Sequence, residues 1–515
     1  MGAKLGSEQL GKLYTTGKTR RRREWRGFRD TFYDFSRWLS IMGMLTRFLA
    51  KPHNLKAFFR YRWMSNYVAV PSMIDRHTVG LRGKHLRIAH LEYDLVAKDV
   101  AGLLNNAFKS DRRCGNDKKL SQKCVILDEN EMFAIMCGFP NLKAVSWETA
   151  AVYANVLLNG AGVTHYLDVI QEMGVPGDVC PMPAAEAGVV IDDDFPIYGC
   201  CAISCNTTCD GSLMGNTIMD KRYEGLGIPT FQIAAPLRHT EKGVQEYAAQ
   251  ENRNAIKFIE EKTGEKWDWD YYFACMKRFN EENRLRKEWM EISRTMYPQV
   301  IDANLTLYGE TAYMAVAGRA QAFVDVDRKI TKLARKAYEN KELVCKEYRH
   351  RALIWGVQAQ YYTDFLPWLQ NCWGILPLVD MLSCVYLGQY SETDKEQAMY
   401  DLAKIYQEMI MRNRTHGGYE VLLDDMFKFV DYYNCDMVIL WEHISCKALD
   451  GMHGMFEQRA REKGVKLVWV NHDLMDPRIV PRQNLRDDIN RYMRSIMREE
   501  PVDPSLEVID DTNAW

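Results

Sequence analysis

The 515-residue sequence contains no apolar stretch long enough to cross a lipid bilayer. Its first 25 residues are polar and basic and lack the apolar segment of a secretory signal. The most apolar region, Leu353 to Gly388, is interrupted by polar side chains at Gln358, Gln360, Asp364, Gln370, Asn371 and Asp380. We therefore expect this region to be a buried core segment, the chain to have no transmembrane segment, and the protein to be cytoplasmic.

Several nucleotide-binding and metal-binding motifs are also missing. No G-x4-G-K-[ST] loop occurs, so the chain is not expected to hydrolyse ATP itself. Paired C-x2-C knuckles and His/Cys combinations with finger spacing are absent, which argues against a zinc site. Cys201, Cys205 and Cys209 form C-x3-C-x3-C, which differs from the C-x3-C-x2-C signature of radical enzymes that use S-adenosylmethionine.

Cysteine, by contrast, is plentiful, with 14 residues, four of them within positions 200–209. Irregular spacing in a chain expected in a reducing compartment argues against a disulfide framework. Three roles remain, which are core packing, metal ligation and nucleophilic chemistry. Those expected to be inert packing, because they lie in largely apolar runs, are Cys137, Cys275, Cys345, Cys372 and Cys384.

Positive charge is concentrated at the front of the chain. Residues 1–84 hold 18 Lys and Arg against 5 Asp and Glu, whereas the whole chain has a net charge of −2. Within this basic arm, Lys18 to Met64 alternates cations with apolar residues at helical spacing. The pattern fits a helix docked on a partner subunit or on the chain's own body, a nucleic-acid arm, or a membrane-surface helix. We favour the docking helix, because no nucleic-acid recognition motif is present, and expect no nucleic-acid partner.

From about Leu86 onward the pattern becomes that of an α/β protein. The first half predicts a strand over Ile197 to Ile203, then a polar loop, a helix and another strand, which is the order of a parallel sheet. The second half repeats this order, with strands over Met437 to Trp441 and Lys466 to Val470. Between them, Glu241 to Arg294 is helical, with a break at Gly264.

The predicted fold is therefore α/β, with two open parallel-sheet domains of flavodoxin or Rossmann type, joined by a helical segment and preceded by a helical extension. We expect five parts along the chain. They are a basic helical extension (1–85), a first α/β domain (86–240), a helical connector (241–349), a second α/β domain (350–500) and a C-terminal tail (501–515).

Three cysteines from separate loops could together hold an iron-sulfur site. Cys180 follows a Gly-Val-Pro turn, Cys209 precedes Asp210-Gly211, and Cys446 follows a predicted strand of the second half. Loops at the carboxyl ends of parallel strands are where such sheets bind ligands. Thiolates suit an iron-sulfur cluster, and nearby Gly and Pro let backbone N–H groups approach the sulfurs. Three cysteines rather than four would leave one iron open to substrate.

An ordered set of motifs between Cys124 and Met497 resembles a known family. The chain is similar to the iron-sulfur subunits of 2-hydroxyacyl-CoA dehydratases, of the 2-hydroxyglutaryl-CoA dehydratase D-component type, and of the related ATP-dependent benzoyl-CoA reductases. The motifs are "GVPGDVCPMP", "CNTTCDG" followed by "GIPTFQIAAP", "EEKTGEKWDWD", and "HISCKALDGMHGMFEQRAREKGVKLVWVNHDLMDPR".

The resemblance implies specific roles for four residues. Cys180, Cys209 and Cys446 would hold one [4Fe-4S] cluster between the two α/β domains, with the fourth iron free of cysteine. Glu148, in "SWETAA", lies where several relatives have an acidic residue facing the substrate, and is the candidate general base. The resemblance leaves open whether a flavin also binds.

The implied activity is the elimination of water from an (R)-2-hydroxyacyl-CoA to give a 2-enoyl-CoA. A separate ATP-hydrolysing activator would deliver one electron, and a ketyl radical on the substrate thioester would expel hydroxide. The implied partners are this activator, a homologous second iron-sulfur subunit and the acyl-CoA substrate. One alternative is a reductase subunit acting on an aromatic acyl-CoA. Another is a non-catalytic electron-relay subunit whose cluster Cys205 or Cys201 would complete.

Overall fold

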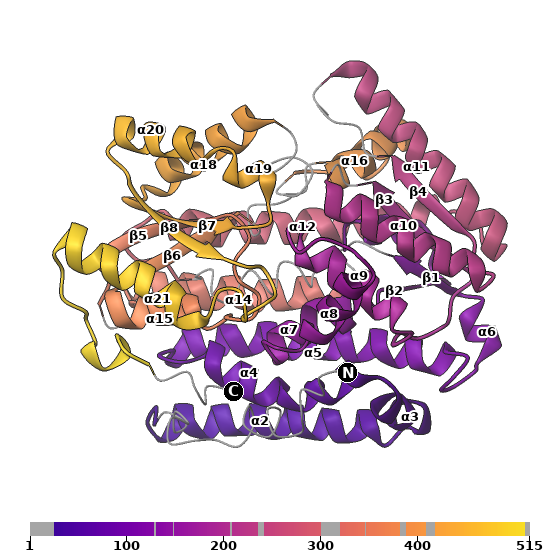
Figure 1. Cartoon of the computed structure of the whole chain (residues 1–515), viewed down its shortest axis with the longest axis horizontal. Helices are drawn as coiled ribbons and strands as arrows, with labels where there is room; N and C mark the ends of the chain where they lie inside the picture. The colour runs from indigo at the N-terminus through magenta and orange to yellow at the C-terminus, as the bar shows by residue number, and fades with distance from the viewer. Residues whose placement is uncertain are drawn as a thin grey trace.

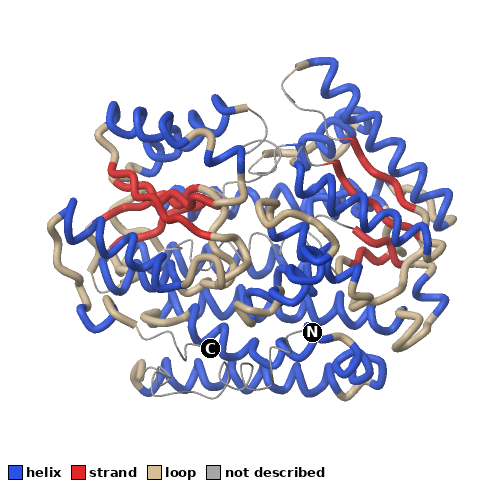
Figure 2. Tube along the Cα trace, viewed as in Figure 1, coloured by secondary structure: helices blue, strands red, loops and turns tan. Residues whose placement is uncertain are grey.

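The structure is a computed structural model, and two four-stranded parallel sheets organise it (Figures 1 and 2). The first sheet comes from the first half of the chain and the second sheet from the second half, and they lie side by side above a layer of long helices. The residues that the structure describes are 25–127, 130–147, 149–206, 209–234, 241–299, 320–345, 347–381, 388–407 and 418–509.

The first sheet has the strand order β2-β1-β3-β4, with every pair parallel. Its strands are β1 (Cys124–Leu127), β2 (Lys143–Val145), β3 (Cys201–Asn206) and β4 (Thr230–Ala234). Side chains alternate between its two faces, so Cys201 and Cys205 lie in one apolar cluster while Ala202 lies in another. Helix α11 (Lys242–Thr263) covers the face that carries Cys201 and Cys205.

The second sheet has the equivalent order β6-β5-β7-β8, again with every pair parallel. Its strands are β5 (His350–Trp355), β6 (Ile375–Asp380), β7 (Met437–His443) and β8 (Lys466–His472). β5 and β6 are buried along their whole length, as expected for parallel strands covered on both faces. The covering helices include α15 (Phe365–Trp373), α18 (Tyr419–Tyr433), α20 (His453–Lys463) and α21 (Arg482–Arg491).

Three long helices cross the molecule in Figure 1, with α5 (Gly83–Ser110) lowest, α14 (Gln321–Glu339) above it and α12 (Trp269–Ser293) at the height of β7. They pack on one another, α5 against α14 and α14 against α12. Below them lie α2 (Phe28–Leu49), α3 (Pro52–Arg60), η1 (Arg62–Ala69) and α4 (Val70–His77).

A buried ion-pair group fixes α2 onto α5. The Asp34 carboxylate lies 3.1 Å from Arg26 Nη1 and 2.8 Å from His90 Nε2, and all three side chains are nearly inaccessible to solvent. Because α5 begins at Gly83, it continues without interruption across position 85, where the sequence places the end of the N-terminal extension. The division of the chain into domains stays a prediction.

Shorter helices connect these elements. They are α6 (Lys118–Ser121), η2 (Asn130–Gly138), η3 (Thr149–Tyr153), α7 (Ala154–Leu158), α8 (Thr164–Glu172), α9 (Pro181–Ile191), α10 (Asp210–Gly225), α16 (Lys395–Gln407), α19 (Lys447–Asp450), η4 (Tyr492–Met497) and η5 (Pro504–Leu506). Within the described residues, no helix combines the length and the apolar composition needed to cross a membrane.

The predicted fold class is confirmed, and the largest difference from the sequence prediction is the start of one strand. β3 begins at Cys201 rather than Ile197 and continues to Asn206. Gly199 just before it has φ 92°, and a Cβ there would lie 2.9 Å from Ile126, so the backbone enters the strand through a turn that only glycine fits. Gly264, with φ 74°, ends α11 as predicted.

Candidate functional site

Each of the three predicted cluster cysteines is the residue that caps the N-terminus of a helix. Cys180 precedes α9, Cys209 precedes α10 and Cys446 precedes α19. In α9 a proline follows the cap directly, and its fixed φ suits the first helical position. The positive end of a helix dipole favours a thiolate placed there.

Backbone N–H groups of the first helical turns point at these sulfurs. The N–H of Ser212 donates to Cys209 Sγ at 3.3 Å. The backbone N–H groups two residues after Cys180 and two and three residues after Cys446 lower the pKa of those thiols, so they favour the ionised form. Donors of this kind are what tunes a sulfur-bound metal centre.

The two cysteine-capped helices of the first half approach each other closely at Gly211. A Cβ on Gly211 would lie 2.9 Å from Pro183 Cγ and 3.2 Å from Cys180 Cβ. Any larger residue would therefore push α10 away from α9. The glycine lets the helix that follows Cys209 lie directly against the loop that carries Cys180.

Lys447 joins the segments of all three cysteines. Its Nζ lies 2.7 Å from Asp210 Oδ2 and 3.8 Å from Asp178 Oδ2. Lys447 adjoins Cys446, Asp210 adjoins Cys209, and Asp178 lies two residues before Cys180. The three side chains are well exposed to solvent, so these ion pairs add little stability. These ion pairs do show that segments 237 residues apart in the sequence are neighbours in the structure.

The three thiols are close enough to influence one another's ionisation. Burial raises the pKa of the Cys180 thiol well above its ordinary value, and the Cys209 and Cys446 thiols raise it further. Burial also raises the pKa of Cys446, and Cys209 adds to the shift. Placing three thiolates together in a partly buried site costs free energy unless a cation compensates the charge. A cationic metal centre would supply that compensation.

This donor set fits an iron-sulfur cluster better than a single metal ion. Among the described residues, no three His, Cys, Asp or Glu side chains converge closely enough to hold one ion. The ligands of a single ion meet at one point, whereas the thiolates of a [4Fe-4S] cluster bind different irons and stay further apart. Three soft sulfur donors with N–H neighbours match the predicted site in chemistry.

The sequence analysis missed a buried carboxyl group beside the site. Asp473 directly follows β8, is 1% exposed, and accepts hydrogen bonds from the N–H groups of Met475 (2.9 Å) and Asp476 (2.7 Å). Burial raises the pKa of Asp473 to about 6, and its charge reaches Cys180. The position of Asp473 directly after a parallel strand could have marked it as a candidate site residue. Its burial, however, could not be predicted from the sequence.

Two buried histidines lie at the same edge of the second sheet. His443 and His472 end the neighbouring strands β7 and β8, and their rings lie 5.5 Å apart. Burial lowers the pKa of His443 to about 4 and that of His472 to about 3. Both rings are therefore neutral near pH 7.

Glu148 is outside the described residues, and the two other cysteines named as candidates lie away from the site. Cys201 and Cys205 are buried in the apolar cluster that the first sheet forms with α11, whereas Cys180 and Cys446 lie at the border of the other cluster. The alternating faces of β3 thus direct Cys201 and Cys205 away from the cluster that borders the site.

Comparison with protein families gives a match over most of the chain. Residues 136–495 match the family described as 2-hydroxyglutaryl-CoA dehydratase, D-component. The chain belongs to this family. D-component family members are subunits of dehydratases that generally depend on iron-sulfur centres and work with an activator, so this chain is a dehydratase-type subunit. No curated protein matches the chain closely.

The D-component match confirms the family predicted from the motifs. It includes the three cysteine-capped helices, Asp473 and the whole second sheet. It excludes β1 and the helices from α2 to α6. The N-terminal helical layer therefore lies outside the matched residues.

Proposed function

We propose that this chain is the iron-sulfur core subunit of a 2-hydroxyacyl-CoA dehydratase, with Cys180, Cys209 and Cys446 as ligands of one [4Fe-4S] cluster. The observation that carries the proposal is the meeting of three cysteine-capped helix ends from both halves of the chain, joined by Lys447. The proposed reaction removes water from an (R)-2-hydroxyacyl-CoA and yields a 2-enoyl-CoA.

When bound, the cluster would supply one-electron chemistry and an iron free to polarise a substrate oxygen. The chain's own residues would supply the surroundings. Three helix N-termini stabilise the negative charge of the thiolates. The buried, neutral His443 and His472 keep the edge of the second sheet dry. Exclusion of water strengthens electrostatic interactions with a bound thioester.

Two carboxyl groups are candidates for proton transfer. Glu148 is the proposed general base for the substrate C–H group, as the family resemblance suggests. Asp473 retains a proton up to about pH 6 and lies within electrostatic reach of Cys180, so it could hold or return a proton near the cluster. The expelled hydroxide needs such a proton to leave as water.

The partners follow from what the chain lacks. The sequence has no ATP-binding loop of the G-x4-G-K-[ST] type, so the electron would come from an ATP-hydrolysing activator. A homologous second iron-sulfur subunit would complete the enzyme.

The test is turnover by anaerobically purified protein combined with the second subunit, an activator and ATP. We expect a 2-hydroxyacyl-CoA to be converted to the 2-enoyl-CoA, with no product when ATP or the activator is omitted. Reduction of benzoyl-CoA without dehydration would replace the proposal with the reductase alternative. If the cluster is intact but neither the 2-hydroxyacyl-CoA nor benzoyl-CoA is consumed, the electron-relay role would be favoured.

A further inference from the structure

The outer face of α2 carries a row of large apolar side chains in contact with solvent. Trp25 is 63% exposed, Phe28 87%, Phe32 76% and Leu39 51%. Phe28, Phe32 and Leu39 follow one another at intervals of four and seven residues, so they lie on one side of the helix, and Trp25 lies just before its start. The opposite side, with Ile41 among its buried residues, packs on α5.

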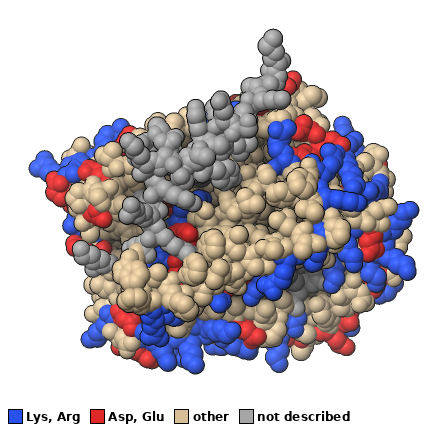
Figure 3. Space-filling model, turned by 90° about the horizontal axis from the view of Figure 1, so that it is seen from below, with Lys and Arg blue, Asp and Glu red and all other residues tan. Residues whose placement is uncertain are grey.

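Helix α3 extends this face. It contacts α2 and exposes Leu55 (45%) and Phe59 (80%), one helical turn apart. Figure 3 shows the underside of the molecule, with uncharged side chains across its middle and Lys and Arg gathered along its edges. Solvent-exposed apolar patches of this extent mark sites of interaction rather than ordinary surface. We call these exposed side chains of α2 and α3 the aromatic face.

Around the aromatic face cations outnumber carboxylates, of which Asp94 pairs with Arg37 and Asp193 pairs with Arg60. Between Trp25 and Met73 the sequence has eight Lys and Arg residues, and the only acidic residues are Asp30 and Asp34. Asp34 is buried against α5, and Asp30 accepts hydrogen bonds from the Gly83 N–H (2.7 Å) and from Arg87. Both carboxylates therefore point inward and are neutralised there.

This excess of positive charge favours a negatively charged binding partner for the aromatic face. A second copy of the chain would place the same cations face to face, which is unfavourable. The chain's own residues 1–24 carry seven Lys and Arg against two Glu, so they would also be repelled. Four of those cations, Arg20 to Arg23, form a continuous run that only Glu24 separates from Trp25, and they extend the positive charge along the chain.

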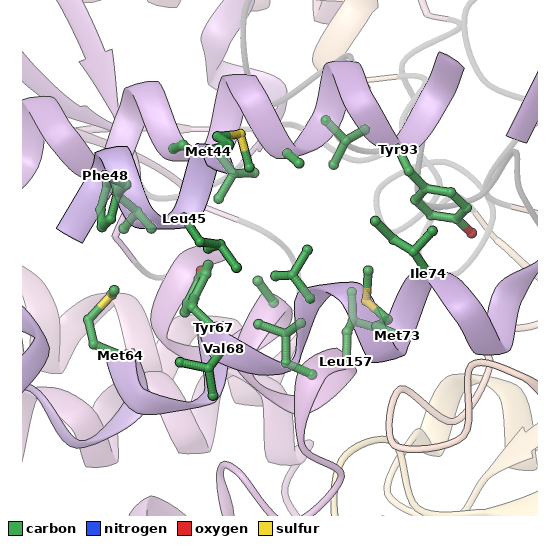
Figure 4. Close-up of a pocket in the computed structure, with 18 of the residues that line it drawn as sticks. Met44, Leu45, Phe48, Met64, Tyr67, Val68, Met73, Ile74, Tyr93 and Leu157 are labelled. Atoms are coloured by element: carbon green, nitrogen blue, oxygen red, sulfur yellow. The ribbon is translucent and has the colours of Figure 1, made fainter. Parts of the chain in front are cut away.

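The shape of the face favours a fluid surface over a folded partner. The rings project into solvent, while a nearby apolar cavity of about 110 Å³ lies on the inner side of α2, lined by Met44, Leu45 and Phe48 (Figure 4). A lipid surface accepts projecting rings without matching hollows, and Trp and Phe with Lys and Arg are the residues that interfacial helices use.

We propose that α2 and α3 dock the protein on an anionic lipid membrane surface. The aromatic face enters the boundary between headgroups and acyl chains, and the surrounding Lys and Arg contact lipid phosphates. The surface lies outside residues 136–495, so the inference does not depend on the proposed dehydratase activity.

Vesicle sedimentation with the full-length protein tests this inference. We expect the protein to sediment with vesicles of phosphatidylcholine mixed with phosphatidylglycerol, to stay in solution with phosphatidylcholine alone, and to be released by high salt. The double variants F28S/F32S and R29E/K56E should each lower vesicle affinity at least about tenfold. The matched control is I496S, which removes an exposed apolar side chain (65%) far from α2 in sequence and should leave affinity unchanged.

Equal sedimentation of wild-type protein and F28S/F32S would overturn the proposal, as would equal binding to neutral and anionic vesicles. Wild-type protein that stays in solution with anionic vesicles would also overturn it, and would leave an acidic protein as the occupant of the aromatic face. Circular dichroism of each variant should match the wild type, because the substituted side chains are largely exposed.

Discussion

The two halves of the chain build the same sheet and contribute unequally to the site. The orders β2-β1-β3-β4 and β6-β5-β7-β8 are equivalent, and in each half the third strand of the sequence leads to a cysteine-capped helix. Cys209 and Cys446 therefore occupy corresponding positions. The third thiol, Cys180, lies in the connection between β2 and β3, and within the described residues the second half has no counterpart to it. In the corresponding connection of the second half, α18 is preceded by Gly418.

This asymmetry means that one half holds a pair of thiols and the other adds a single one. Cys180 and Cys209 are held at fixed spacing by the contact of α9 with α10, at Gly211. Cys446 reaches them across the boundary between the halves, where exposed ion pairs of Lys447 provide the connection. Duplicated topology can thus produce a site with two firmly placed ligands and one that depends on how the halves pack.

The largest expected effect is loss of the cluster when any one of the three thiols is removed. C180S, C209S and C446S, purified without oxygen, should each lose most of the iron, against about four irons per chain in the wild type. Dehydratase activity should fall at least about a hundredfold. C275S is the matched control, because Cys275 is fully buried in α12, and it should keep its iron. Full iron content in C446S would show that the second half supplies no ligand.

A smaller effect on stability and iron content is expected at Gly211, where α9 and α10 fix the spacing of Cys180 and Cys209. G211A places a methyl group within 2.9 Å of Pro183 and 3.2 Å of Cys180 Cβ, so overpacking should cost about 1–3 kcal/mol of unfolding free energy and lower iron content. The control is G225A in the same helix, where no atom lies within 4 Å of the new methyl group, and which should be neutral or slightly stabilising. Denaturant unfolding measures both. Equal stability of the two variants would mean that α10 can shift without cost.

The smallest effect is expected at the amino edge of the second sheet, where Asp436 joins three strands. Its carboxylate bonds to His350 Nδ1 (2.7 Å), the Arg351 N–H (2.8 Å) and Lys466 Nζ (3.0 Å). Burial alone would raise the pKa of Asp436, but these three donors outweigh it and hold the pKa well below its usual range. The same hydrogen bond raises the pKa of His350.

The pH dependence follows from these two shifts. The stabilisation from Asp436 is present above pH 3.8, the ordinary aspartate pKa, and is lost as the pH falls below it. The stabilisation from His350 is present below pH 6.5 and is lost as the pH rises above it. D436N should therefore lose about 1 kcal/mol, since the side chain is 40% exposed, and mainly between pH 4 and 6.5. A pH-independent loss in denaturant unfolding would contradict this assignment.

Much of the fold could be predicted because parallel sheets have a characteristic local sequence pattern. Alternation of apolar strands with helices indicated the two parallel sheets, and Gly264 marked the end of α11. The start of β3 was misplaced because Gly199 enters the strand through a turn that depends on contact with Ile126, which is distant in the sequence. Cys180, Cys209 and Cys446 were predicted as ligands because they lie in loops that follow predicted strands or turns. Their role as ligands stays a prediction.

Two features of the site could not be predicted, since they depend on packing between halves. The burial that raises the pKa of Asp473 comes from surrounding elements rather than from its sequence neighbours. The contact of Lys447 with Asp210 spans 237 residues and involves ordinary surface residue types. The separation of Cys205 from Cys180 follows from strand alternation, but only once the boundaries of β3 are known.

The 237-residue interval between the segments of Cys209 and Cys446 has a consequence for biosynthesis. A ribosome completes the first half, with its two thiols in place, well before the last one has been translated. Metal delivery to a nascent polypeptide would therefore meet an incomplete receptor. If these three thiols hold the proposed cluster, its assembly would have to wait until translation has passed the second half.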